Sequence, residues 1–415
     1  MEVKPGYKRT EVGIIPQDWD VMHVRDLVRQ GPKNGYSARS RDNASGTATL
    51  SLAATSSGRL VLNDATVKHL EDSIPAGSLL FLETGDVLVQ RSNTAELVGT
   101  TAIFDGPPAT FVYPDLMMRL RFKEPTTGQW FWRYANSRSG RSFFRSAAAG
   151  STGSMPKISG EKLRKMLVPV PPLAEQEAVA AALRDADAVI ESLEHLVIKK
   201  RHLKQGAMQE LLTGKRRLPG FESEPGLKQT EAGRIPNDWD YDNIENLAEI
   251  TTGGRNTQDR VDDGQYPFFV RSQIVEHINS YSYDGEAVLT AGDGVGTGKV
   301  FHYINGKFDA HQRVYRLSEF SDRINGYFFY LYFSSHFYNR IMQMTAKSSV
   351  DSVRREMIAR MPVPFPPTKD EQGAIAVILS DMEDEIAVLE ANVTKARQLK
   401  QGMAQELLTG KVRLV

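Results

Sequence analysis

Polar side chains able to contact a nucleic acid gather in several irregular segments of the chain. A guanidinium group can donate two hydrogen bonds to guanine, a side-chain amide can pair with adenine, and hydroxyl or ammonium groups can bind phosphates. The candidates of these types are Tyr36, Arg39, Arg41, Arg91, Ser92, Asn93, Ser151, Thr152, Lys157, Arg271, Ser272, Gln273, Lys299, His311, Gln312, Arg313, Lys347, Ser348, Ser349 and Arg354. Their chemistry is that of non-covalent recognition.

The sequence contains no catalytic or metal-binding motif. Zero cysteines exclude disulfides, thiol nucleophiles and cysteine-ligated metals, and the eight histidines lack a ligand spacing such as His-Glu-x-x-His. There is also no Gly-x-Ser-x-Gly elbow, and no tetrapeptide of the kind that orients an amino group for methylation. We therefore expect a chain that binds and does not catalyse, without a cofactor or metal of its own.

The glycine-rich run at 292–299 resembles a phosphate-binding loop only in part. A Walker loop needs glycine five residues before its Gly-Lys pair and Ser or Thr after it, but Asp293 and Val300 hold those places. Two alternatives are a structural turn and a loop whose backbone amides approach a nucleic-acid phosphate, with Lys299 supplying charge.

Charge is unevenly distributed along a chain whose formal net charge is zero. Residues 116–166 hold eleven basic groups against two acidic ones, and residues 299–361 hold ten against five. Residues 240–298 hold three basic groups against eleven acidic ones. These counts predict local polyanion sites, or basic residues that simply solvate a surface.

The chain is a tandem duplication in which four parts occur twice. An entry motif, a long variable block, a proline-rich joint and a helix follow one another and then return. The matching pairs are 8–20 with 228–240, 168–176 with 363–372, and 203–218 with 399–414, the last at an offset of 196. This repetition predicts one scaffold that carries two different blocks.

Two long helices follow from apolar residues spaced by three and four. The seam at Leu183, Ala186, Ile190, Leu193 and Val197 returns 196 residues later. Helices from about 175 to 212 and 371 to 408 would each expose that seam alone, so we expect an antiparallel coiled coil. The alternative is two separate helices, each packed on its own block. The Pro-Pro pairs at 171–172 and 366–367 suit rigid joints into the helices.

The blocks between these parts are predicted to be mixed α+β. Strands are expected at 79–82, 86–90, 101–104 and 119–122, and at 268–271, 287–290 and 313–317. The aromatic stretches 130–134 and 327–333 are expected to form helices that face a core. The fold class is therefore α+β, with two globular mixed α/β domains in pseudo-twofold tandem repeat, joined by two long antiparallel helices.

Length and composition agree with several domains. A chain of 415 residues exceeds the size of one core, and with 40% hydrophobic residues it has no apolar run long enough to cross a bilayer. We expect a first globular domain at 1–167, a helix and spacer at 168–218, a second globular domain at 219–362 and a second helix at 363–415. A soluble cytoplasmic protein without a membrane partner is expected.

The order of motifs resembles the specificity subunit of type I restriction-modification systems over essentially the whole chain. It runs Ile-Pro-x-Asp-Trp, a variable block, Val-Pro-x-Pro-Pro, Glu-Gln, a long helix and Glu-Leu-Leu-Thr-Gly-Lys-x-Arg-Leu. The resemblance implies two target-recognition domains, each binding one half of a split site in double-stranded DNA. It also implies helices that space the halves and dock two methyltransferase subunits, which bind S-adenosylmethionine. Restriction subunits, which cleave, would join through that complex.

Two other classes of protein remain as alternatives. A coiled-coil scaffold that does not bind DNA would explain the helices but not two divergent blocks with local basic surplus. An enzyme would need a motif that the sequence lacks. The acidic stretch 240–298 departs from the charge expected of a DNA-binding surface.

Overall fold

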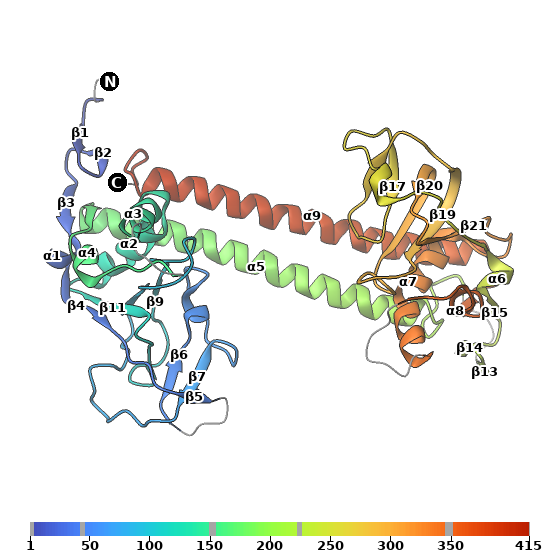
Figure 1. Ribbon diagram of the computed structural model, residues 1–415, viewed down its shortest axis with the longest axis horizontal. Coiled ribbons are helices and arrows are strands. Elements are labelled where there is room, and N and C mark those ends of the chain that lie inside the picture. The colour runs from blue at the N-terminus through green and yellow to red at the C-terminus, as the bar shows by residue number, and fades with distance from the viewer. Residues whose placement is uncertain (1–3, 42–45, 149–154, 222–225, 345–351, 415) are drawn as a thin grey trace. The chain divides into compact units, whose positions relative to one another are not determined.

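The computed structural model describes residues 4–41, 46–148, 155–221, 226–344 and 352–414. The chain divides into two compact units. Unit 1 comprises residues 1–192 and 392–415, and unit 2 comprises residues 193–391. Each of the two long helices therefore has one half in each unit (Figure 1). The finer division of the chain at residues 167, 218 and 362 stays a prediction.

Among its described residues, the first copy of the repeat contains two four-stranded sheets, and three helices lie between the last strand of those two sheets and the strand that precedes the long helix. The elements are β1 (Tyr7–Thr10), β2 (Gly13–Pro16), β3 (Asp20–His23), α1 (Val24–Leu27), β4 (Val28–Asn34), β5 (Ser40–Arg41), β6 (Ala48–Leu50), η1 (Leu52–Thr55), β7 (Val67–Leu70), β8 (Val87–Gln90), β9 (Thr101–Ile103), β10 (Phe111–Val112), β11 (Met117–Phe122), α2 (Pro125–Asn136), α3 (Arg138–Ala148), α4 (Gly160–Arg164), β12 (Leu167–Val170) and α5 (Leu173–Leu211). The sheet orders are β4-β11-β8-β9 and β10-β6-β7-β5. Helix α2 packs on β9 and β11, with Trp130 and Phe131 buried.

The second copy contains one six-stranded sheet, ordered β16-β21-β19-β20-β17-β18. The elements are β13 (Leu227–Thr230), β14 (Gly233–Pro236), β15 (Asp240–Asn243), α6 (Ile244–Leu247), β16 (Glu249–Thr252), η2 (Thr257–Asp259), β17 (Tyr266–Phe269), β18 (Glu276–Ile278), β19 (Tyr283–Ala291), β20 (Phe301–Ala310), β21 (Val314–Ser318), α7 (Gly326–Met344), α8 (Arg355–Ala359), β22 (Pro362–Phe365) and α9 (Lys369–Leu407). Helix α7 packs on β19 and β20, and its rings Phe328, Phe333 and Phe337 are buried. The aromatic stretches are thus core helices, as predicted.

One predicted strand is wrong. Residues 79–82 form turns and not a strand, and Leu79 is 54% exposed. The backbone carbonyls of Leu79 and Phe81 accept hydrogen bonds from the buried guanidinium group of Arg119, at 2.7 and 3.2 Å. A backbone whose carbonyls bind an arginine in this way does not form a strand ladder, although its apolar run suggested one.

The repeated entry and joint motifs form the same frame in both copies. The hairpin β1-β2 returns as β13-β14, and the antiparallel pair β3-β12 returns as β15-β22. The side-chain amide of Gln176 donates to the Pro171 carbonyl at 2.8 Å, and that of Gln372 donates to the Pro366 carbonyl at 2.9 Å. The repeated glutamine thus fixes the joint at the start of each long helix.

Ion pairs between α5 and α9 run in antiparallel order. In unit 2 Lys200 pairs with Glu385 at 2.6 Å, and Lys204 pairs with Glu383. In unit 1 Lys400 pairs with Asp187. The pairs Asp187 with Lys400 and Glu383 with Lys204 are related by the repeat offset of 196. The apolar seam is buried at Leu183, Ile190 and Val197 and at the matching α9 residues, so the coiled coil is confirmed within each unit.

An arginine beyond the end of each helix closes the frame. Arg413, which follows α9, donates to both oxygens of Asp18 at 3.0 and 2.8 Å and to both oxygens of Glu175 at 2.5 and 2.8 Å. The Trp19 indole N–H also donates to Glu175, at 2.8 Å. Glu175 is 1% exposed, so the ion pair compensates a buried carboxylate. Hydrogen bonding from Arg413 lowers the pKa of Asp18.

The second copy has the same closure. Arg217, which follows α5, bonds both oxygens of Glu371 at 2.6 and 2.7 Å and both oxygens of Asp238 at 2.9 Å. Burial raises the pKa of Glu371, and Arg217 opposes that shift. Gly214 packs on Pro236 with φ +68°, a left-handed backbone that favours glycine. Each closure, defined as this Arg-Glu-Asp cluster, lies inside one compact unit.

We predict that Arg413→Met destabilises unit 1 by about 3 kcal/mol, because it leaves Glu175 buried without its cation. Thermal unfolding followed by tryptophan fluorescence should show a lower midpoint, with Arg217→Met giving a similar loss in unit 2. Lys411→Met is the matched control, since the Lys411 ammonium pairs with Glu406 at 3.4 Å in an exposed position. A midpoint for Arg413→Met equal to that of the control would refute the structural role of the closure.

Candidate nucleic-acid interface

Most of the described candidates of unit 2 lie around the loop between β19 and β20, residues 292–300. The Arg271 guanidinium group donates to Asp293 at 2.8 Å, and Arg313 lies 3.7 Å from the same carboxylate. The Gly292 amide donates to the Arg313 carbonyl at 2.8 Å. Lys299 is exposed, with its ammonium 5.5 Å from the centre of the Tyr338 ring. This loop brings together residues that lie up to 42 positions apart in the sequence.

Several neighbouring candidates support this loop from inside the fold. His311 is 5% exposed, and its Nδ1 accepts the Arg313 amide at 2.9 Å. Burial lowers the pKa of His311, and the positive charges of Arg271 and Arg313 add to that effect. The Ser272 carbonyl contacts the His302 ring at 2.9 Å, whereas Gln273 is exposed.

Gln312 is the candidate that connects the residues around this loop to the segment that follows β16. Its side-chain amide donates to the Asn256 side chain at 2.7 Å, and its backbone amide donates to the Arg255 carbonyl at 2.9 Å. Gln312 is itself exposed, so its side chain lies at the surface while part of its bonding capacity is used internally.

In unit 1 the equivalent loop lies between β8 and β9, residues 91–100. Ser92 forms an antiparallel bridge with Lys157, and the Ile158 amide donates to the Arg91 carbonyl at 2.9 Å. In unit 2 Asp293 bridges Ser352, and the Val353 amide donates to the Gly292 carbonyl at 2.7 Å. Both loops therefore have the same backbone support but different side chains.

The side chains of the unit 1 loop are partly committed to the fold. Ser92 is 1% exposed, and its hydroxyl has no hydrogen-bond partner among the described residues. Asn93 donates to the Gln90 side chain at 2.6 Å and accepts the Thr94 amide at 2.8 Å. Arg91 is half-buried, with its guanidinium group 3.5 Å from the Asp115 carbonyl, and Lys157 is exposed.

The remaining candidates lie on two other segments or outside the described residues. The Tyr36 hydroxyl donates to Asp72 at 2.9 Å, and the Arg39 carbonyl accepts the Glu71 amide. The backbone of Arg41 ends β5. Arg354 is exposed and precedes α8. Ser151, Thr152, Lys347, Ser348 and Ser349 lie outside the described residues.

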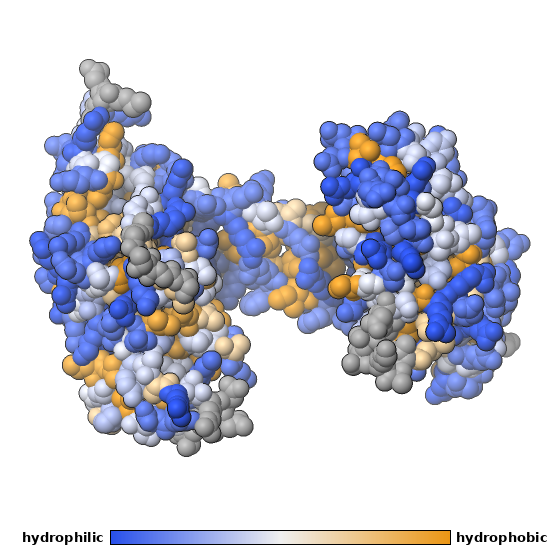
Figure 2. Space-filling model, viewed as in Figure 1, coloured by the Kyte–Doolittle hydropathy of each residue, from blue (hydrophilic) through white to orange (hydrophobic). Residues whose placement is uncertain are grey.

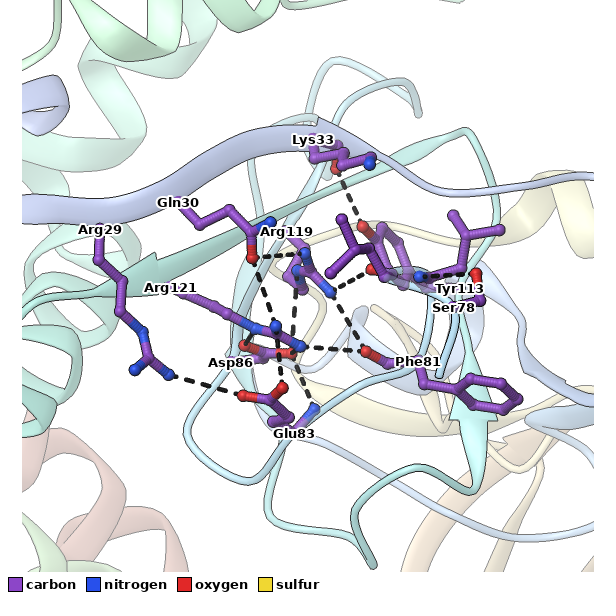
Figure 3. Close-up of polar contacts among 12 residues, drawn as sticks. Arg29, Gln30, Lys33, Ser78, Phe81, Glu83, Asp86, Tyr113, Arg119 and Arg121 are labelled. Carbon is purple, nitrogen blue, oxygen red and sulfur yellow. Dashed lines mark hydrogen bonds and ion pairs between the residues drawn. The ribbon is translucent and has the colours of Figure 1, made fainter. Parts of the chain in front are cut away.

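Two basic residues counted toward the surplus at 116–166 are buried, which corrects the charge argument. Arg119 and Arg121 are 0% and 8% exposed. The Asp86 carboxylate accepts from Arg121 at 2.7 Å and lies 3.9 Å from Arg119 (Figure 3). Burial alone would lower the pKa of Arg121, but hydrogen bonding to Asp86 raises it. These cations hold the loop before β8 through its backbone carbonyls and are withdrawn from the surface.

Sequence reasoning missed this arginine cluster. Gln30 on β4 accepts from both guanidinium groups, at 3.1 and 3.3 Å, and Glu83 lies 2.9 Å from Arg121 and 3.5 Å from Arg29. The alternation of Arg119 and Arg121 along β11 puts them on the same face of the sheet, and that spacing was the available signal. Gln30, Glu83, Arg29 and Arg121 also line an open pocket.

Two absences hold for the described part of the chain. No group of three or more His, Cys, Asp or Glu residues there could hold a metal ion. Within the same ranges, no helix has the length and hydropathy needed to cross a membrane.

Comparisons with known proteins agree on one family. Residues 236–396 match the model of the type I restriction modification DNA specificity domain. The chain is 22% identical to the MjaX type I restriction enzyme specificity subunit of Methanocaldococcus jannaschii, over 98% of this chain and 97% of that protein. It is 30% identical to the EcoDI specificity subunit of Escherichia coli, over 43% of this chain and 38% of that protein.

The fold agrees with a solved structure of the same kind. The crystal structure of the type I restriction-modification S subunit from M. genitalium superposes with a TM-score of 0.59 and 12% sequence identity. The superposition covers 98% of each chain. At this identity the match shows the shared fold. Residues 236–396 thus match the DNA specificity domain of type I restriction-modification systems, and almost the whole chain is similar to specificity subunits of those systems.

Proposed function

We propose that the chain recognises a two-part site in double-stranded DNA, with one part read by each compact unit. The observation that carries this proposal is the pair of equivalent loops, residues 91–100 in unit 1 and residues 292–300 in unit 2. The same bridge, Ser92 with Lys157 and Asp293 with Ser352, supports both loops, yet the residues on the loops differ. One scaffold with two unlike loops suits two unlike half-sites. A scaffold that does not bind DNA would have no use for this difference.

Partner subunits supply the chemistry in this proposal. The chain would dock two methyltransferase subunits, which bind S-adenosylmethionine, and restriction subunits would join through them in the cytoplasm. Figure 2 displays apolar residues at the surface along the long helices. Leu203 and Leu399 occupy equivalent positions in the repeated Leu-Lys-Gln-Gly motif and are 50% and 65% exposed. Two equivalent apolar residues suit two copies of one partner.

Within each loop, roles are divided by position. Lys157 is exposed where the unit 1 bridge forms, so we assign it to the phosphate backbone. Arg91 in the unit 1 loop and Arg271 beside the unit 2 loop are held by side-chain hydrogen bonds, so we assign them to base edges. The buried Ser92 and His311 support the loops in this proposal and contact no base.

Replacing the first variable block tests whether one unit reads one half-site. We predict that exchanging residues 20–160 for the block of another specificity subunit changes one half of the methylated site only. Sequencing of methylated positions after modification by the reconstituted complex measures this. If both halves changed, the assignment of one half-site to each unit would be wrong.

Single substitutions test the division of roles. Arg91→Ala or Arg271→Ala should cost about 1 to 3 kcal/mol on the cognate duplex and relax selection at one position. Lys157→Ala should weaken binding to every duplex and lower the salt slope by roughly one unit. Binding isotherms at several salt concentrations measure both effects.

The control for this series is Lys123→Ala. Lys123 is an exposed lysine of unit 1 that follows the C-terminal end of β11, whereas the candidate loop lies at the N-terminal end of that strand. This substitution should leave both the affinity for each duplex and the salt slope unchanged. Equal losses on cognate and scrambled duplexes for the arginine variants would show that the arginines only contact phosphates.

Charge on the repeated leucines tests docking. We predict that Leu203→Asp or Leu399→Asp removes one methyltransferase subunit from the complex, and that the double variant removes both, because each buries a carboxylate at an apolar contact. Native mass spectrometry measures the stoichiometry. Val388→Asp is the control, since Val388 is 60% exposed on α9 but Ser192 holds the equivalent place on α5. Unchanged stoichiometry in the double variant would place docking elsewhere.

A further inference from the structure

Asp293 is an acidic residue in the loop 292–300 of unit 2, which would face DNA, a polyanion, in the proposed function. Its carboxylate binds Arg271 through a 2.8 Å hydrogen bond and lies 3.7 Å from Arg313. The Asp293 side chain is 25% exposed, and those of Arg271 and Arg313 are 44% and 64% exposed. An exposed ion pair contributes little stability, so these contacts are not explained by folding alone.

The backbone around Asp293 limits where its carboxylate can point. The residue forms the bridge with Ser352, and the amide of the preceding Gly292 binds the Arg313 carbonyl. Gly294 follows with φ +83°, and a Cβ there would lie 3.9 Å from Arg271 Nη1. The carboxylate is thus presented between two guanidinium groups by a loop fixed on both sides.

Unit 1 has the same backbone without the acid. Ser92 forms the equivalent bridge, but its hydroxyl is buried and without a hydrogen-bond partner among the described residues. Arg91 instead reaches a backbone carbonyl, that of Asp115. The acid is therefore dispensable for the scaffold and peculiar to the loop of unit 2.

A carboxylate at this place has opposite effects on affinity and selectivity. It repels phosphates, so it lowers affinity for DNA in general. It also fixes the orientation of arginines whose remaining N–H groups can donate in a fork to a base. A group that lowers general affinity and orders the arginines increases the difference between right and wrong sequences.

We propose that Asp293 is a specificity-determining residue of unit 2, which positions Arg271 and Arg313 for base recognition and weakens binding to non-cognate DNA. The inference rests on the proposed function and adds a residue that acts through others. It makes Asp293 a positioning residue whose loss relaxes selection without weakening DNA binding as a whole.

The test uses the full chain reconstituted with its methyltransferase subunits. The wild-type complex first defines its cognate site by methylation of a random-sequence duplex library. Binding of Asp293→Asn is then measured on cognate and scrambled duplexes at several salt concentrations. We expect the preference for the cognate duplex to fall about 10-fold, the scale of one lost base contact. Binding to the scrambled duplex should strengthen, and the salt slope should steepen by roughly one unit.

Three further variants separate this role from a structural one. Asp293→Ser, which carries the residue found at this place in unit 1, should behave as Asp293→Asn does. Asp293→Glu keeps the charge and should restore part of the preference. Asp284→Asn removes the same charge from an exposed position on β19 and should leave the preference unchanged. Selection in the half-site read by unit 1 should not change in any variant.

The outcomes distinguish failure of the proposed function from failure of the role assigned to Asp293. A wild-type complex without sequence preference would overturn the proposed function itself. A selective wild type with an equally selective Asp293→Asn and Asp293→Ser would overturn the role of Asp293 alone. Equal weakening on both duplexes, with a lower melting temperature, would show that the carboxylate only stabilises the loop.

Discussion

The two arginine closures are the interaction on which the rest of the frame depends. Each joins the segment after one long helix to the first turn of the other helix and to an Asp-Trp entry motif, through Arg413 and Glu175 or Arg217 and Glu371. Because the glutamate of each cluster is almost fully buried, separating it from its arginine would leave an uncompensated buried charge. The antiparallel order of α5 and α9 is consequently specified twice, once in each compact unit. The antiparallel pairs β3-β12 and β15-β22 adjoin this frame, since β12 and β22 lead directly into the two proline joints.

The repeated elements could be predicted from the sequence because their signals are local or periodic. The seam residues of both helices, the proline joints and the aromatic core helices all follow from spacing over one or two turns. The closures could not be predicted in the same way. Arg413 and Asp18 are 395 residues apart, and although both lie in repeated motifs, nothing in either motif says that one binds the other. The repeat shows that equivalent residues occur in both copies, and only the fold shows what they contact.

The candidate loops could be located but not aligned from sequence. Matching the shared ends at an offset of 195 places Ser352 opposite Lys157, whereas the loops themselves, Ser92 and Asp293, differ by 201 positions. A change in length between the loop and the block ending therefore hides the equivalence of Ser92 and Asp293. The backbone bridges reveal it, because a bridge is set by geometry and not by residue type. The comparison of a buried serine with a carboxylate between two arginines depends wholly on that alignment.

Charge counted along the sequence fails for a related reason. In the basic stretch at 116–166, Arg119 and Arg121 are withdrawn from the surface by Asp86, which lies outside that stretch. In the acidic stretch at 240–298, Asp240 and Asp242 pair with Arg323, and Asp293 pairs with Arg313, both arginines lying beyond it. Both stretches are therefore nearer to neutral than their counts suggest. Since a sheet brings strands from distant segments together, the field that DNA would meet depends on these long-range pairs, and the acidic count of the second block does not argue against DNA binding.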